Sequence, residues 1–279
     1  MPHTPIPQVP EFKFAGDWET RVAMGQWPDI QHIIKFGRNP AVVTTEEDIW
    51  EVGGKQTLLT VGATMYASCE DNTNGVGQVL LITGLDANWD IQEGIVTLTG
   101  QTQATITKLD GTAATWTRIH RAYQISAEPD PVGDVWIAET DTLTLGVPDT
   151  ATKVHGFINF TDAAQQTQQA LFTIPRNYVG VMYHFEASIL TPATGARRSA
   201  EVGLEIQNLA DGATSSNPSW APFRRQYSAV LDSDAGVVHE QVFRIPLVFP
   251  ELTNVHARAV ATSSSDIFSL YEMYLMPTT

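Results

Sequence analysis

The residues best placed to do chemistry lie in one short segment of the first half of the chain. Asp86, Asn88 and Asp90 reproduce the first three alternating oxygen ligands of a calcium-binding loop. The pattern then stops, because Ile91 stands where the loop needs glycine and Thr97 where it needs a bidentate glutamate. We therefore expect a hairpin turn held by aspartate side-chain hydrogen bonds, and no metal site.

Other signatures of catalysis are incomplete. Gly54-Lys55-Gln56-Thr57 resembles the end of a phosphate-binding loop, but Gln56 follows the lysine and Ile49 replaces the first glycine. No Gly-x-Ser-x-Gly elbow and no His-Glu-x-x-His motif occurs. We expect no enzymatic activity, with a hydrolase that uses unrecognised carboxylates as the remaining enzymatic alternative. The histidines are spread singly, as is typical of structural residues: His3, His32, His120, His155, His184, His239 and His256.

Cysteine and aromatic residues offer little more chemistry. Cys69 is the only cysteine, which excludes an intrachain disulfide and a cysteine-based zinc site, and we interpret it as a small buried side chain. Trp89, Trp220 and Tyr227 lie in or beside predicted turns, where solvent-facing rings could stack on sugars. The alternative is that these rings pack against a neighbouring subunit or under a loop.

Composition narrows the classes of partner. The 279 residues carry a net charge of −15, which argues against nucleic-acid binding because phosphate contacts need a basic surface. Apolar stretches reach about half a dozen residues, far short of the ~20 that a membrane-spanning helix needs. The N-terminus lacks the pattern of a secretory signal. We expect a chain made in a cytoplasm, with no cofactor and no membrane or nucleic-acid partner.

The positions of turns and apolar residues predict an all-β fold. Short strands recur between turn signals, and residues 78–125 read as a β-meander that forms the core of the first half. Gly37-Arg38-Asn39-Pro40 reads as a turn that ends an early strand. The clearest alternation places Val202, Leu204 and Ile206 on one face of a strand. These patterns predict two β-sandwich or jelly-roll-like modules, over residues 31–162 and 163–279.

Residues 1–30 differ from the rest and are predicted to form an extended N-terminal arm. Prolines at positions 2, 5, 7 and 10 bias this segment towards extended backbone. Four aromatic side chains would anchor the arm on a neighbouring subunit: Phe12, Phe14, Trp18 and Trp27. The alternative is a strap across the chain's own first module.

Several segments together resemble a family of structural proteins of tailed, mostly marine, bacteriophages. The resemblance covers residues 31–279, although Asn88-Trp89-Asp90-Ile91 is bulkier than the polar turn expected there. It is carried by Lys35-Phe36-Gly37-Arg38-Asn39-Pro40, Glu47-Asp48-Ile49-Trp50 with Gly53-Gly54, Ile82-Thr83-Gly84-Leu85-Asp86-Ala87-Asn88-Trp89, Glu93-Gly94-Ile95-Val96-Thr97-Leu98-Thr99-Gly100, Thr117-Arg118-Ile119-His120-Arg121-Ala122-Tyr123 and Gln169-Ala170-Leu171-Phe172-Thr173-Ile174-Pro175. The resemblance implies a virion component that assembles in repeated copies on a particle.

We therefore expect a non-enzymatic virion structural protein, made in the host cytoplasm. The first hypothesis is a capsid decoration or cement protein that binds the major capsid protein and neighbouring copies through its arm and β-module surfaces. A homo-oligomer is expected, with a trimer favoured. The alternative is a fibre, spike or tail component that binds host surface glycans through the loops of Trp89 and Trp220.

Overall fold

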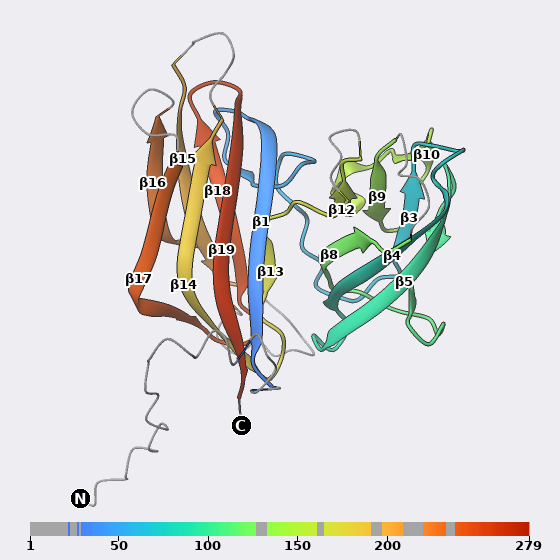
Figure 1. The fold of residues 1–279 in the computed structure, drawn as a ribbon, viewed down its shortest axis with the longest axis horizontal. Helices are drawn as coiled ribbons and strands as arrows, with labels where there is room; N and C mark the ends of the chain where they lie inside the picture. The colour runs from blue at the N-terminus through green and yellow to red at the C-terminus, as the bar shows by residue number, and fades with distance from the viewer. Residues whose placement is uncertain are drawn as a thin grey trace, which may run out of the picture.

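The computed structural model describes residues 22, 27, 29–126, 133–160, 165–190, 197–208, 220–232 and 238–278. They form antiparallel strands and one 3-10 turn, η1 (Ala151–Lys153), arranged as two β-modules beside one another (Figure 1). The predicted all-β architecture of sandwich modules is confirmed. Within the described residues, no helix is long and apolar enough to cross a membrane.

The larger module is a jelly roll built from two sheets of four main strands each, and a further short strand, Glu47–Asp48, pairs with one of them. One sheet has the strand order β1-β19-β14-β17 and the other has the order β13-β18-β15-β16. With these eight strands lettered B to I along the chain, the sheets read B-I-D-G and C-H-E-F, which is jelly-roll connectivity. The strand bounds are β1 (Gln31–Val42), β13 (Leu171–Thr173), β14 (Tyr178–Ile189), β15 (Ser199–Gln207), β16 (Arg224–Asp232), β17 (Val238–Phe249), β18 (Asn254–Ala261) and β19 (Ser265–Pro277).

The core of the jelly roll lies between its two sheets. Val202, Leu204 and Ile206 of β15 are buried there, as their alternation predicted, and they share the core with Phe185 and Tyr271 of the opposite sheet. Burying each large apolar side chain contributes roughly 1.5–3 kcal/mol, so this cluster is the main source of stability for the module.

The smaller module is inserted between the first two strands of the jelly roll. Its two sheets have the orders β12-β9-β3-β6 and β7-β5-β4-β8, and together they enclose a second apolar core around Trp116. A short hairpin, β10-β11, lies outside these sheets. The bounds are β3 (Tyr66–Cys69), β4 (Val76–Leu85), β5 (Ile91–Thr99), β6 (Ala104–Thr105), β7 (Thr107–Lys108), β8 (Arg118–Gln124), β9 (Val135–Ala138), β10 (Leu143–Thr144), β11 (Val147–Pro148) and β12 (Val154–Ile158).

Strand pairing corrects the expected division into residues 31–162 and 163–279. Strand β1 pairs with β19 along most of its length, and β2 (Glu47–Asp48) pairs with β18. The first residues assigned to the N-terminal module therefore belong to the C-terminal sandwich. Local patterns could not reveal this, because a strand's pairing partner is fixed by tertiary packing and not by its own alternation.

The two ends of the insertion meet above a glycine of β1. The Ala170 N–H donates to the Ile49 carbonyl at 2.9 Å, and Trp50 bridges to Gln169. A Cβ on Gly37 would lie 2.3 Å from both Ala170 N and Ile49 O, so only glycine allows this approach. The prediction of a turn at Gly37 is therefore wrong. The strand continues to Val42, and the glycine serves close packing.

The expected meander over residues 78–125 is only half correct. Strands β4 and β5 form the predicted hairpin, but β8 pairs with β4 and not with β5. The sheet order β7-β5-β4-β8 places β8 at one end, where it faces the jelly roll (Figure 1). This position brings the side chains of β8 to the surface between the two modules, which we call the seam.

Candidate functional site

The buried guanidinium of Arg118, at the start of β8, is the centre of the seam. Its Nη1 donates to the carbonyl oxygens of Leu59 and Thr117 at 2.7 Å each. Across the seam, Nε donates to Thr173 Oγ1 at 2.9 Å, and Nη2 donates to Asn254 Oδ1 at 3.2 Å. Burial lowers the pKa of Arg118 to about 9. One side chain of the inserted module therefore binds two strands of the jelly roll.

Two tryptophans pack around this guanidinium. The Arg118 Cζ atom lies 4.9 Å from the ring centroid of Trp89 and 5.6 Å from that of Trp220. The two indoles meet edge to face, with centroids 5.5 Å apart, and form a small cluster with Leu85 and Leu252. Cation–π contacts of this kind gain strength where water is excluded.

This packing overturns the expectation of a solvent-facing aromatic platform. Trp89 is 1% exposed, so its ring cannot stack on a sugar as predicted, and the half-buried Trp220 packs against it. Trp89 adopts a left-handed φ of 68° in its turn and lies against the jelly roll, so it is buried by tertiary contact that its turn position could not show. Tyr227 lies far from both in the fold: it is half-buried and bonded to His239 Nε2 at 2.5 Å.

The Asp86–Asp90 turn is the hairpin device that the sequence predicted. Asp86 Oδ1 accepts the backbone N–H groups of Asn88 at 2.7 Å and Asp90 at 3.0 Å. The Asp90 carboxylate binds Arg176 of the jelly roll, with Nη2 to Oδ2 at 2.7 Å. No group of metal-binding side chains occurs among the described residues. The carboxylates of this turn therefore serve the turn and the seam.

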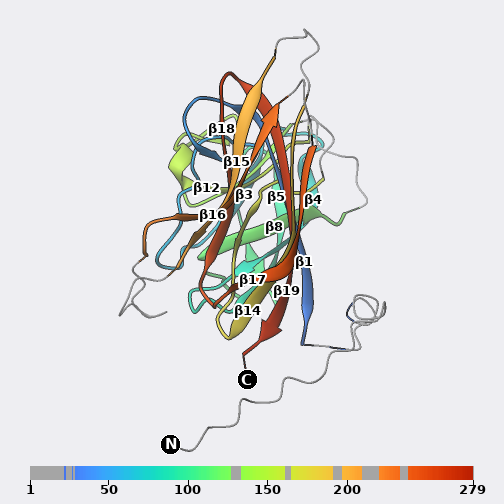
Figure 2. The ribbon, with the colours of Figure 1, turned by 90° about the vertical axis from the view of Figure 1, so that its left-hand side faces the viewer.

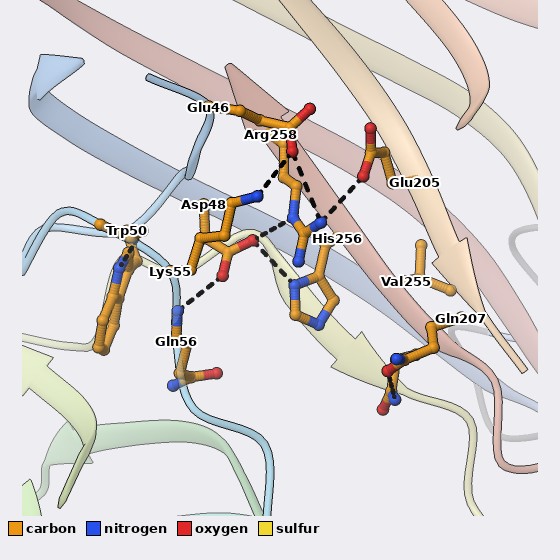
Figure 3. A network of polar contacts seen from close by, with 12 residues as sticks. Glu46, Asp48, Trp50, Lys55, Gln56, Glu205, Gln207, Val255, His256 and Arg258 are labelled. Carbon is orange, nitrogen blue, oxygen red and sulfur yellow. Dashed lines mark hydrogen bonds and ion pairs between the residues drawn. The ribbon is translucent and has the colours of Figure 1, made fainter. Parts of the chain in front are cut away.

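A second polar network holds the segment that leaves β1 against the jelly roll (Figure 3). Asp48 Oδ1 lies 3.0 Å from His256 Nδ1 and 2.7 Å from Arg258 Nε, while Oδ2 accepts the Gln56 N–H at 2.7 Å. Arg258 Nη1 also donates to Glu205 Oε2 at 3.0 Å. These side-chain contacts join three strands of one sheet: β2, β18 and β15.

The electrostatics of this network favour a structural role. Burial disfavours a charged Asp48, but His256 and Arg258 more than compensate and lower its pKa to about 2. Burial lowers the pKa of His256 despite Asp48, so the ring is neutral near pH 7 and Arg258 supplies the countercharge. Although Asp–His pairs occur in hydrolases, Asp48 is 0% and His256 1% exposed, so a substrate cannot reach them.

Lys35 and His120 form the third polar contact of the seam. The Lys35 ammonium donates to the His120 carbonyl oxygen. The His120 ring stacks on Phe172 with centroids 4.1 Å apart, and its Nε2 accepts the Thr173 N–H at 3.2 Å. Burial, followed by the charge of Arg121, lowers the pKa of Lys35 to about 7. This lysine is therefore an unusual buried amine at the edge of the seam.

At the opposite end of the jelly roll, aliphatic side chains face solvent. We call this surface, on β16 and β17, the outer edge. Each strand is the last in its sheet, and Figure 2 views this end from the side away from the inserted module. Its exposed residues include Val230 at 76%, Val242 at 59%, Ile245 at 85% and Val248 at 63%. Exposed apolar surface of this kind marks interaction sites.

Strand β17 is irregular around Ile245, which is 85% exposed. Met182 pairs with Leu247 and His184 with Val242, so four residues of β17, 243–246, lie opposite Tyr183 alone. Ile245 and Pro246 are in this protruding stretch. Because a bulge and a proline block the addition of another strand, a partner would contact the outer edge through side chains.

Tyr183 belongs to a polar and aromatic cluster on the outer face of the same sheet. Its hydroxyl donates to the Glu272 carboxylate and lies 2.8 Å from His32 Nε2. His184 Nδ1 lies 3.5 Å from Glu272 Oε1, and Tyr274 stacks on Tyr183 with centroids 5.2 Å apart. Burial, reinforced by Glu272, raises the pKa of Tyr183. Adjacent residues of a regular strand point to opposite faces, but the irregular pairing here brings the side chains of Tyr183 and His184 into one cluster.

The other residues singled out from the sequence are Cys69 and the aromatic anchors of the predicted arm. Cys69 is buried, as expected, and burial raises the pKa of its thiol to about 11, so it is unreactive. Of the arm anchors, Trp27 is 38% exposed, whereas Phe12, Phe14 and Trp18 lie outside the described residues.

Sequence reasoning missed Arg118, Asp48, Arg258 and Lys35. A lone charged residue within an apolar strand pattern, as at Lys35 in His32-Ile33-Ile34-Lys35-Phe36, is the one signal that could have pointed to them. The chain matches no protein-family model and no curated protein.

Proposed function

We propose that this chain is a non-enzymatic structural protein of a virion, and that it decorates or cements a capsid by binding capsid protein and neighbouring copies of itself. The single observation that carries the proposal is the outer edge, where Val230, Val242, Ile245 and Val248 are all more than half exposed. A monomeric protein seldom exposes several large aliphatic side chains along adjoining terminal strands, whereas a subunit that is covered after assembly commonly does.

The fold and the sequence add support. Jelly rolls are frequent in viral capsid and lectin domains, although fold alone never establishes function. The resemblance of residues 31–279 to structural proteins of tailed bacteriophages points to the same class of protein. The seam, with its buried Arg118 and Asp48 networks, suits a rigid building block that presents two modules in a fixed arrangement.

Paired substitutions test the role of the outer edge. Val230→Asp places a charge on a residue that is 76% exposed, and Val61→Asp does the same at 73% exposure in the inserted module. We expect Val230→Asp to abolish oligomerisation, measured by light scattering, and binding to purified particles, while Val61→Asp retains both. A monomeric wild-type protein that does not bind particles, or equal behaviour of both variants, would contradict the proposal.

Antibody labelling of intact particles made from the genome that encodes the chain tests its location. We expect the label at regular positions on the head. Label confined to a fibre or to the tail tip would favour the second candidate function.

That second candidate, binding of host glycans, is favoured by the outer-face cluster. The half-buried ring of Tyr183 stacks on the buried Tyr274 and lies beside Glu272 and His32, so an aromatic side chain with a polar handle and a carboxylate stand together there. If glycans bind here, a glycan array should show a signal that Glu272→Gln abolishes. The same signal in Trp220→Ala should persist, because Trp220 belongs to the seam.

A further inference from the structure

A cleft of about 260 Å³ opens along the seam between β1 of the jelly roll and strands β4, β5 and β8 of the inserted module. Its lining includes Lys35, Thr83, Glu93, His120 and Arg121. Sites for drug-sized ligands occupy about 300–1,000 Å³, so the cleft suits something smaller. Nothing in the virion role proposed above uses this cleft.

The charges in the cleft are unusual for this protein. Lys35 is 7% exposed, and its ammonium donates a hydrogen bond to a neutral carbonyl oxygen, that of His120. Neither Lys35 nor Arg121 forms an ion pair with any described residue, whereas Arg176 and Arg258 each bind a carboxylate. A chain with a net charge of −15 has ample carboxylates to pair with its cations. Two neighbouring cations that form no ion pair with a described carboxylate are therefore notable.

The arrangement of strands separates Lys35 and Arg121 from Glu93, the carboxylate that lines the cleft. Glu93, Thr83 and Arg121 occupy one row across β5, β4 and β8, because Thr83 pairs with both of the others. Neighbouring strands lie about 4.8 Å apart, so Glu93 is roughly two strand spacings from Arg121. Lys35 reaches the β8 end of this row through its bond to the His120 carbonyl. The β8 side of the cleft is therefore cationic.

We propose that this cleft binds a small oxyanion, a carboxylate, sulfate or phosphate group, between the Lys35 ammonium and the Arg121 guanidinium. The Lys35 ammonium uses one of its three donors on His120, which leaves two for the ligand. Charge-assisted hydrogen bonds from a partly desolvated lysine and arginine are the strong contacts that such a group needs. A free inorganic ion and the acid group of a single sugar share this chemistry.

Binding is coupled to protonation of Lys35. Its pKa of about 7 means that the amine is about half neutral at pH 7 in the free protein, and a bound anion favours the charged form. The charged and titratable groups that face the amine are Arg121 and His120 on β8 and Glu93 on β5, while His32 on its own strand borders the cleft with its ring bound to the Tyr183 hydroxyl. Affinity should therefore fall by up to about tenfold per pH unit above pH 7, as linkage requires.

Isothermal titration calorimetry with sodium sulfate, sodium phosphate and sodium glucuronate, against sodium chloride at equal ionic strength, tests this site. We expect at least one probe to bind with proton uptake. Lys35→Met, which replaces the amine with an apolar chain of similar length, and Arg121→Gln should each weaken binding by about tenfold. Glu93→Gln should strengthen it, because it removes the nearest carboxylate of the row.

The probes also identify the source of the anion. Tighter binding of glucuronate assigns the site to a sugar acid, and tighter binding of sulfate or phosphate assigns it to an inorganic ion. Circular dichroism of each variant shows whether it is folded. If Lys35→Met does not fold, the result for Arg121→Gln, which changes an exposed residue, decides whether the proposal holds. Failure of all three probes, or equal binding by wild type and both cation variants, overturns the proposal.

Discussion

The seam and the outer edge distribute polarity in opposite ways. The seam and the network beside it bury charged side chains: Arg118 is satisfied by hydrogen bonds across the modules, and Asp48 binds Arg258 within the jelly roll. The outer edge exposes aliphatic side chains such as Val230 and Ile245. A buried charge network is costly to open, and an exposed aliphatic surface is costly to leave in water. The difference agrees with a seam that is a permanent contact within the chain and with our proposal that the outer edge is covered in an assembly.

The largest expected effect follows from breaking the seam at Asp48. Asp48→Ala should lower the free energy of unfolding by about 3 kcal/mol, because His256 and Arg258 lose a fully buried partner, although Arg258 keeps Glu205. Urea denaturation measures the change. Asp149→Ala removes a carboxylate that accepts one hydrogen bond, from Thr144, in an exposed hairpin, and should cost at most about 1 kcal/mol. Equal losses of unfolding free energy in the two variants would mean that the buried Asp48 network stabilises the fold no more than an exposed hydrogen bond does.

Lys35 gives the seam a distinct dependence on pH. Its folded-state pKa of about 7 lies below its ordinary value of 10.5, so the unfolded chain binds more protons between these values. Stability should therefore rise with pH over this range, by about 2 kcal/mol from pH 7 to pH 9. Denaturation of wild type and Lys35→Met at both pH values measures this contribution as a difference. If Lys35→Met shows the same slope as wild type, the amine is solvated and not part of the seam.

A conservative substitution tests the geometry of the seam. Arg118→Lys keeps a basic group but loses the planar fork that reaches Leu59, Thr173 and Asn254 together, and should cost about 1–2 kcal/mol. Thermal unfolding measures the loss. Arg176→Lys, at an exposed ion pair with Asp90 beside the same seam, should cost less than about 1 kcal/mol. A smaller loss at Arg118 than at Arg176 would reverse this ranking.

The smallest effect on stability is expected at the outer edge. Ile245→Ser should change the free energy of unfolding by less than about 0.5 kcal/mol, because the side chain is 85% exposed in the isolated chain. The same variant should nonetheless weaken oligomerisation, which analytical ultracentrifugation measures. A large loss of stability in the monomer would show that Ile245 packs within its own chain, and would remove the contrast between the two regions.

Much of the fold was predictable because the relevant signals are local. The alternation at Val202, Leu204 and Ile206 and the turn chemistry of Asp86 depend on residues a few positions apart. The pairing of β1 with β19 was not predictable, because it joins residues near opposite ends of the chain. The polar network of Asp48 was missed for the same reason, because His256 and Asp48 are in contact although 208 positions separate them in the sequence.

The sequence by itself determined the all-β class, the buried thiol and the character of the Asp86 turn. Only the tertiary structure decided that Trp89 is buried against Arg118, that the first strand completes the second sandwich, and that Lys35 lies in a cleft where no described carboxylate pairs with it. The physical reason is that side-chain periodicity fixes which face of a strand is apolar, whereas burial depends on what covers that face. Trp89, for example, is covered by Trp220 and Leu252, which lie more than a hundred residues away in the sequence.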